Sequence, residues 1–467
     1  MELTRRLLVL AIPHAFVITA PGATAVRLAV EKELRKRGWP EALSPADADL
    51  LVLCGQGGAD FDSAAQRVWS QFPAPRARAE VCAPEAVGTS LDPSRAALTD
   101  LAALRRSDAD RAVTQPPSAN DNDLNTDGAG DDDGNMDMGG DDHGNMDMSG
   151  MDMDLPGGLP MADRAPDRDG LKLDQLHLVL GPALPHWPAG LIVRLLVQGD
   201  VAQSAEVSAL SPGPGVPFWD GLEASVGAAE TGRVRAAAAA DSLQRFLWVA
   251  GWSAAARTGC WLRDELLDFD EVFPLNPRFS RWLRQVRRSP VLRWSTNGLG
   301  RLDGAAPPRL QGDVTARWLR WTDDVAAVLD SREPASVPEP STNGRSGRND
   351  LPPQHRSSQL ADERAISAQA SLTMLPSLLA GQELAVARLI VASLDPDLDA
   401  LHAATHPGAT GPAEALQAGP PQAGPPQAGP PQAGPPQAGP PQAGPPQAGP
   451  PQAGTPHVHD KAEHLND

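Results

Sequence analysis

Long hydrophobic runs, cysteines and basic residues are all scarce in this chain of 467 residues. No run of about eighteen apolar residues occurs, which excludes a conventional membrane-spanning helix. The three cysteines, Cys54, Cys82 and Cys260, are too few and too scattered for a disulfide framework or a cysteine-rich metal site. Lysine and arginine total 40 against 59 acidic residues, and the net charge of −19 argues against nucleic acid as a partner. The sequence therefore predicts an acidic protein with reduced thiols that is not itself transmembrane.

Glycine and proline are abundant, and their uneven distribution divides the chain into five pieces. The predicted pieces are an α/β module (1–105), an acidic Met/Asp-rich linker (106–168), an α+β module with a helical-bundle core (169–330 and 368–402), a second linker (331–367) and a QAGPP-repeat tail (403–467). We expect the linkers and the tail to be disordered, because they carry too few large apolar side chains to offset the entropy cost of ordering. The fold class is then an α/β module plus an α+β module, joined by disordered linkers.

In the first module, apolar runs alternate with stretches of helical periodicity. The predicted order is an apolar run at 6–18, a helix at 25–40 that Pro40 ends, a buried strand at 46–55 and a second helix at 63–73. This order predicts an α/β unit with a parallel sheet. The run 6–18 also has the features of a secretory signal, since arginines precede it and 23–25 reads ATA. Against that interpretation, Pro13 and His14 interrupt the run, and the helix after it completes the α/β pattern.

The second module begins with two strands and continues with helices. Strands are predicted at 176–181 and 191–207, with a reversal at Gln198, Gly199 and Asp200, and helices at 236–267 (one long or two stacked), 280–294, 314–331 and 374–394. Tryptophans on these helices are expected to pack in the core: Trp248, Trp252, Trp261, Trp282, Trp294, Trp318 and Trp321. The helix at 280–294 has a basic face, made of Arg281, Arg284, Arg287, Arg288 and Arg293. That face is either simply solvated or a docking surface for an acidic partner or an anionic membrane.

Two repeats lie outside the predicted modules. The tail repeats QAGPP seven times from Gln417 to Pro451, and its prolines favour an extended, partly polyproline II spacer or a docking peptide. In the acidic linker, DDDGNMDMGG (131–140) is followed by DDHGNMDMSG (141–150). Its thioethers and imidazole are ligands suited to copper, so the candidate metal ligands are Met136, Met138, His143, Met146, Met148, Met151 and Met153. The alternative is an acidic spacer whose methionines were duplicated with the repeat.

Two short patterns in the first module occur in a fixed order. Residues 44–55 read SPADADLLVLCG, and residues 64–81 read AAQRVWSQFPAPRARAEV. Together they resemble the small iron–sulfur subunit of respiratory complex I and of the related membrane-bound NiFe hydrogenases. That family reads S-P-x-x-A-D-L, a glycine-ended strand, a helix and P-x-P-R. The matching positions are Ser44, Pro45, Ala48, Asp49, Leu50, Gly55, Pro73, Pro75 and Arg76.

The second module resembles the partner large subunit, which bears the quinone pocket in complex I and the nickel site in the hydrogenases. Residues 178–207 are similar to that family's opening hairpin, at Gly181, Pro182, Pro185, Gly190, Arg194, Leu195, Gly199 and Val201. The family's late G-D-x-x-x-R helix has its counterpart at Gly312, Asp313 and Arg317. Residues 381–401 resemble the family's C-terminal helix and closing loop. The chain thus resembles a fusion of the two subunits.

The ligands of the family's redox centres are missing from this sequence. Four cysteine thiolates hold a four-iron cluster in the small subunit, two of them adjacent just after the first strand. Residues 18–22 read ITAPG at that place, and Cys82 alone cannot hold a cluster. The large-subunit hairpin places histidines in G-P-x-H-P-x-x-x-G, but Leu184 and Pro188 stand there and His186 lies off register. Nor is there a pair of C-x-x-C motifs for nickel.

The resemblance implies a pseudoenzyme, with the fold kept and the cofactor ligands lost. We expect a non-catalytic structural or coupling subunit of a complex I-like assembly (NADH–quinone oxidoreductase or hydrogenase type), with no catalytic residue and no cofactor of its own. The expected partners are membrane subunits of a complex I-like or antiporter-like assembly, and the expected location is cytoplasmic, peripheral on the inner face of the cell membrane. Two alternatives stay open. One is a copper-handling protein that uses the Met/Asp/His linker, and the other is a quinone oxidoreductase subunit active only with a partner's redox centres.

Overall fold

The computed structural model describes six stretches of the chain. These are residues 12–100, 164–166, 172–212, 216–269, 277–329 and 353–406. All of them belong to the compact unit that ends at Gly411. Among these residues, no helix is long and apolar enough to cross a bilayer. The Met/Asp-rich repeat and the QAGPP tail lie outside the described residues.

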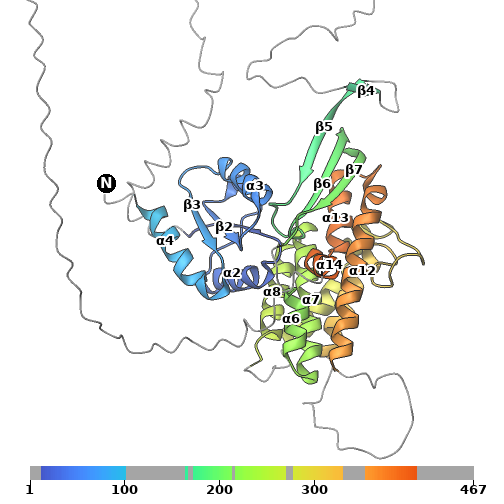
Figure 1. Ribbon diagram of the computed structural model, residues 1–467. Coiled ribbons are helices and arrows are strands. Elements are labelled where there is room, and N and C mark those ends of the chain that lie inside the picture. The colour runs from blue at the N-terminus through green and yellow to red at the C-terminus, as the bar shows by residue number, and fades with distance from the viewer. Residues whose placement is uncertain are drawn as a thin grey trace, which may run out of the picture. The chain divides into compact units, whose positions relative to one another are not determined.

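The first module contains a three-stranded parallel sheet (Figure 1). Its strands, in the order β1-β2-β3, are β1 (Ala15–Thr19), β2 (Leu50–Cys54) and β3 (Ala77–Val81). Every residue of β2 is buried, which explains its unbroken apolar sequence, because a central parallel strand is covered on both faces. The predicted parallel α/β unit is confirmed.

Helices follow each strand of this sheet. They are α2 (Thr24–Arg37), α3 (Ala59–Ser70) and α4 (Val87–Thr99), with short 3₁₀ turns at Pro45–Asp47 and Pro84–Ala86. Helix α2 ends before Pro40, because Gly38 adopts a left-handed conformation with φ of 69°. The Gly38 N–H donates to the carbonyl of Arg35 at 3.1 Å, and the helix ends at Arg37, three residues before the predicted end.

The second module begins with an antiparallel sheet in the order β4-β5-β6-β7. The strands are β4 (Arg164–Pro166), β5 (Lys172–Leu180), β6 (Leu191–Gln198) and β7 (Val201–Ala209). Gly199 takes φ of 65° in the tight turn between β6 and β7, so the predicted reversal is confirmed. Leu191, Val193 and Leu195 point from β6 into the core of the module.

Nine helices among the described residues complete this module. They are α6 (Phe218–Ser225), α7 (Ala228–Val249), α8 (Ser253–Leu266), α9 (Pro277–Arg287), α10 (Pro290–Thr296), α11 (Val314–Leu329), α12 (Pro353–Leu379), α13 (Leu384–Leu394) and α14 (Leu398–Thr405). Helix α7 packs against both α8 and α11, and α12 packs against β7 and α14 (Figure 1). The predicted combination of a hairpin with packed helices is present.

Two helical predictions and one linker prediction need correction. The stretch 280–294 forms two helices, because Pro290 begins a new helix whose Leu292 N–H donates to the Ser289 hydroxyl at 3.2 Å. The stretch 374–394 is interrupted at Gly381, whose N–H donates to the carbonyl of Ala202 in β7 at 2.7 Å. The segment 331–367 is not all linker, since α12 already begins at Pro353.

The tryptophans expected in the core divide into two groups. Trp318 is fully buried, and its Nε1–H donates to the Thr296 hydroxyl at 3.2 Å. By contrast, Trp261 is 45% exposed and Trp294 is 84% exposed, so the expectation was wrong for these two. Because α10 is only seven residues long and turns Leu292 and Thr296 inward, Trp294 is left on the outside.

Candidate functional site

The candidate copper ligands of the acidic repeat lie outside the described residues. They are Met136, Met138, His143, Met146, Met148, Met151 and Met153. Copper binding there stays a prediction. Within the part of the chain that the structure describes, no group of three or more His, Cys, Asp and Glu side chains is arranged to hold a metal ion.

The loop after β1, residues 20–23, contains no cysteine. Its backbone meets the second module, because the Gly22 N–H donates to the Asp399 carboxylate of α14 at 2.8 Å. Cys54, at the end of neighbouring β2, is fully buried, and this burial raises the pKa of its thiol. Cys82 is exposed, and its sulfur accepts from the Gln56 amide at 3.5 Å.

A buried set of ion pairs joins the two modules, and we call it the junction network. Its members are Arg27, Glu31, Arg35, Asp241, Arg245, Arg263, Asp264 and Asp395. Arg263 of α8 is fully buried and donates to Glu31 of α2 at 2.6 Å and to Asp241 of α7 at 2.8 Å. Arg27 of α2 donates to both Asp241 oxygens, at 3.1 and 2.7 Å. The four arginines balance the four carboxylates, so the buried junction carries no net charge.

Electrostatics keep Glu31 and Asp241 of this network ionised. Burial raises the pKa of Glu31, but the charges of Arg263 and Arg27 outweigh it and lower that pKa to about 2. The pKa of Asp241 is likewise held well below its ordinary value, because Arg27, Arg245 and Arg263 outweigh its burial. Glu31 and Asp241 thus stay ionised because each has an arginine partner from the other module, Arg263 and Arg27 respectively.

His186 and Glu41 are buried next to this network. Burial lowers the pKa of His186 to about 3, so its imidazole is neutral at physiological pH, and it stacks on Trp248 with ring centroids 4.8 Å apart. Burial, with the Glu31 charge as the next cause, raises the pKa of Glu41 to about 7. His186 Nε2 lies 3.9 Å from a Glu41 oxygen, which is too long for a hydrogen bond. His186 therefore faces Glu41 of the first module.

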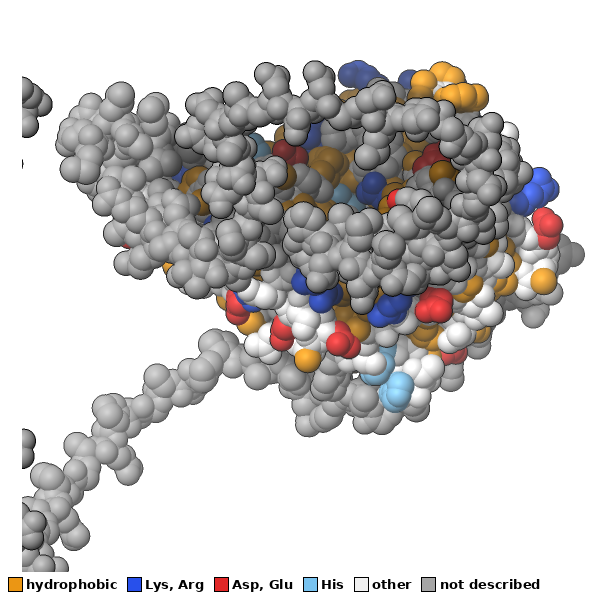
Figure 2. All heavy atoms as spheres, turned by 90° about the horizontal axis from the view of Figure 1, so that it is seen from above, with side chains coloured by type: hydrophobic (Ala, Val, Ile, Leu, Met, Phe, Trp, Pro, Cys, Tyr) orange, Lys and Arg blue, Asp and Glu red, His pale blue; other side chains and the backbone are white. Residues whose placement is uncertain are grey.

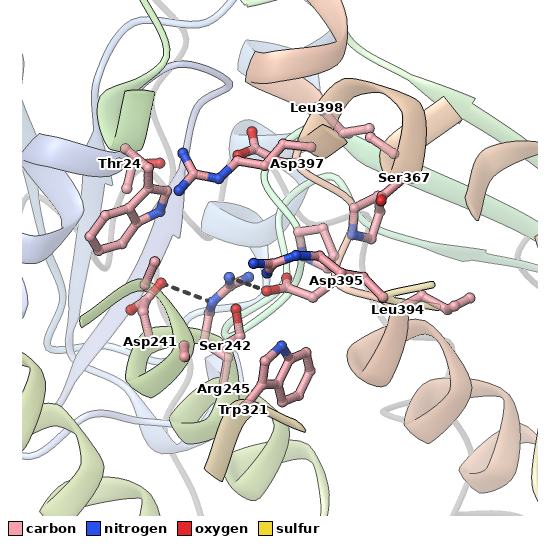
Figure 3. A pocket seen from close by; sticks show the side chains of 18 of the residues that line it. Thr24, Asp241, Ser242, Arg245, Trp321, Ser367, Leu394, Asp395, Asp397 and Leu398 are labelled. Atoms are coloured by element: carbon pink, nitrogen blue, oxygen red, sulfur yellow. Dashed lines mark hydrogen bonds and ion pairs between the residues drawn. The ribbon is translucent and has the colours of Figure 1, made fainter. Parts of the chain in front are cut away.

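A pocket of about 470 Å³ opens beside the junction network and is lined by both modules (Figure 3). Thr19 comes from β1, and Thr24 and Arg27 come from α2. The rest of the lining comes from the β5–β6 loop, α6, α7, the loop before α11, α11, α12, and the segment from the end of α13 to the start of α14. Arg245 crosses its wall and contacts Asp241 at 3.3 Å and Asp395 at 2.7 Å. The volume is in the range of small-ligand sites.

The chemistry of this pocket is polar. Seven arginines and six aspartates line it, with Trp187, Trp219 and Trp321 as its aromatic surface. Burial raises the pKa of Asp399 to about 7, and the neighbouring Asp397 charge adds to the rise. Such a lining suits a ligand with several hydrogen-bonding or charged groups and a flat ring more than a long apolar chain.

Sequence reasoning missed the junction network altogether. Glu31, Asp241 and Arg263 each sit on a helix face that is otherwise apolar. A usable signal was the single aspartate after the run of five alanines at 236–240, since a lone charge on an apolar stripe requires a partner. Which partner it meets is decided by packing between segments more than 200 residues apart.

A scan against protein-family models gives no match to this sequence, and a search of curated proteins gives none either. The interpretation of the site therefore rests on its residues and their geometry.

Proposed function

We propose that this protein is a non-catalytic structural or coupling subunit of a complex I-like assembly, of the NADH–quinone oxidoreductase or hydrogenase type, peripheral on the inner face of the cell membrane. The observation that supports this proposal most is the junction network. It joins, in one chain, the two modules that resemble separate small and large subunits, and does so with buried, charge-balanced ion pairs. A structural subunit needs such a fixed junction, because it has to hold the binding surfaces of its two modules in a constant orientation to each other.

The site chemistry is in line with a structural role. In the described residues, the loop after β1 makes backbone contacts to Asp399 and the buried Cys54 thiol has a raised pKa, so neither offers a thiolate. His186 is neutral, stacked and buried. These side chains stabilise the junction rather than activate a substrate.

The test is co-purification of the tagged full-length chain from detergent-solubilised membranes of the native host, with iron analysis of the eluate. We expect membrane subunits to elute in fixed ratio and this chain to carry no iron. Elution of the chain alone, or an iron–sulfur absorption band after anaerobic purification, would contradict the proposal.

A matched pair of variants tests whether co-elution with the membrane subunits depends on the junction network. Asp264→Asn removes the charge on α8 that Arg35 of α2 contacts across the junction, whereas Asp303→Asn makes the same change at a side chain that is 86% exposed. We expect reduced co-elution for the first variant only. Thermal unfolding of both proteins checks that they remain folded.

A second candidate function is supported by the pocket, which both modules line. In this proposal the chain is a quinone oxidoreductase subunit active only with a partner's redox centres. Calorimetric titration with a short-chain quinone tests it, using Ser242→Phe to fill the pocket and the exposed Ser63→Phe as the control. Binding that Ser242→Phe abolishes supports a quinone site, and no binding by the wild-type chain contradicts it.

A further inference from the structure

Helices α9 and α10 present a surface of one charge sign that the junction and the pocket do not explain. Between residues 277 and 302 the sequence holds seven arginines and no aspartate or glutamate, although the net charge of the chain is −19. On the face drawn in Figure 2, by contrast, acidic and basic side chains lie next to one another. The arginine-rich segment is therefore a local exception.

The packing of α9 leaves its arginines outside. Phe279, Trp282, Leu283 and Val286 are buried on one face of the helix. The opposite face exposes Arg281, Arg284 and Arg288, whose side chains make no ion pair or hydrogen bond within the described stretches. Two further arginines have structural partners, since Arg287 pairs with Asp323 at 2.7 Å and Arg293 donates to the Arg287 carbonyl.

Large apolar side chains are exposed on the short helix that follows α9. On α10, Val291 is 70% exposed and Trp294 is 84% exposed. A hollow of about 400 Å³ is lined by arginines of α9 and α10 together with Ala326 and Leu329 of α11. Arginines around an exposed tryptophan are typical of surfaces that rest in the headgroup region of a membrane, where the indole ring prefers the interface.

We propose that this α9–α10 surface, made of Arg281, Arg284, Arg288, Val291 and Trp294, binds anionic phospholipid membranes directly. Guanidinium groups bind phosphate oxygens through paired hydrogen bonds. A lipid surface offers a phosphate to each arginine, whereas a protein partner would need acidic side chains placed to match the arginines. Val291 and Trp294 then enter the headgroup region between them. This inference rests on the proposed function for one point only, namely that the membrane concerned is the inner face of the cell membrane. Beyond the proposed function, it states that the lipid itself is a binding partner.

The experiment measures co-sedimentation of the purified full-length chain with phosphatidylcholine vesicles that contain or lack phosphatidylglycerol. The test variant is Arg281→Gln/Arg284→Gln/Arg288→Gln. The control is Lys32→Gln/Arg67→Gln/Arg388→Gln, which removes the same charge from exposed positions on α2, α3 and α13. Circular dichroism of both variants checks that they are folded.

We expect binding only to the anionic vesicles, and weaker binding at high salt. Each lost arginine should weaken binding about fivefold, so the test variant binds about 100-fold more weakly while the control binds like the wild type. Trp294→Ala should weaken binding severalfold without changing its salt dependence.

Two results would overturn the inference. One is equal binding to both kinds of vesicle or to neither, and the other is an equal loss in the test and control variants. Binding to immobilised polyglutamate without binding to vesicles would assign the surface to an acidic protein instead. Because these vesicles contain no protein, a failure here leaves co-purification with membrane subunits unaffected, so the two proposals fail separately.

Discussion

At the residue scale, the junction depends on charged side chains that are at most 16% exposed. Arg263 contacts Glu31, Asp241 and Asp264 and has no exposed surface. Removing one member of a buried ion pair leaves its partners desolvated and uncompensated, which costs more than the pair contributes as a whole. A single substitution in this network is therefore expected to lower the free energy of unfolding by more than the number of hydrogen bonds that it removes suggests.

Arg263→Met should lower the free energy of unfolding by about 3–5 kcal/mol, because Glu31 and Asp241 lose the guanidinium between them. Urea denaturation measures this change. Arg257→Met is the matched control on the same helix, and its exposed side chain predicts a change within about 0.5 kcal/mol. Equal effects of the two variants would show that the network does not stabilise the fold.

Glu41 predicts a pH dependence of stability. Its pKa is raised to about 7 in the folded protein, so between that value and its ordinary 4.5 the folded chain binds more protons than the unfolded chain. The contribution of Glu41 to the free energy of unfolding is fully present below about pH 4.5 and is lost as the pH rises from there through 7. Glu41→Gln should therefore stabilise the protein by about 2 kcal/mol at pH 8 and change little at pH 4, as urea titrations at both values can measure.

Glu85→Gln, at an exposed position of the same module, is the control for this substitution. It should leave the pH dependence of unfolding as in the wild type. A Glu41→Gln protein that is less stable than the wild type at pH 8 would mean that the carboxylate is needed in its charged form.

At the element scale, one side chain fixes the start of α11 against the preceding loop and α13. Arg317 donates to the carbonyls of Gly300, Leu310 and Gly312 and to the hydroxyl of Ser393, at 2.9–3.1 Å. Asp313 accepts from the N–H groups of Ala316 and Gly298. The G-D-x-x-x-R pattern thus has a structural explanation, since its polar residues satisfy backbone groups of three segments.

Arg317→Lys should destabilise the protein by about 2–4 kcal/mol, although the charge is kept. A lysine ammonium has three donors at a single point and cannot reach the four acceptors that the planar guanidinium serves. Thermal unfolding checks this, with Arg388→Lys on an exposed face of α13 as the control. Equal melting temperatures would mean that charge alone matters at this position.

At the scale of the whole molecule, the buried residues among those that the structure describes all precede residue 411. The buried cores of both modules lie between Ala15 and Ala400, and chain contacts divide after Gly411. Proline-rich repeats bury little apolar surface. We therefore expect a chain truncated after Gly411 to unfold at the same urea concentration as the full-length protein, and a shift of the midpoint by more than about 0.2 M would show that residues 412–467 stabilise it.

Local patterns determined more of the fold than of the site. The apolar run 50–54 and the reversal at Gly199 were predictable, because burial on both faces and a positive φ leave clear marks in sequence. Helix ends were less predictable. Gly381 interrupts a continuous helical pattern only because its N–H donates to a carbonyl of β7. The exposure of Trp294 was likewise unpredictable, since it depends on which side of α10 meets α11.

The sequence by itself determined the α/β and α+β patterns, the antiparallel hairpin and the arginine-rich face, all of which follow from spacing within a few residues. Only the tertiary structure decided that Glu31, Asp241 and Arg263 meet. It also decided that His186 is buried against Glu41 and that both modules line one pocket. The physical reason is that the partner of a buried charge is chosen by the packing of distant helices, and this packing has no periodicity that a single sequence displays.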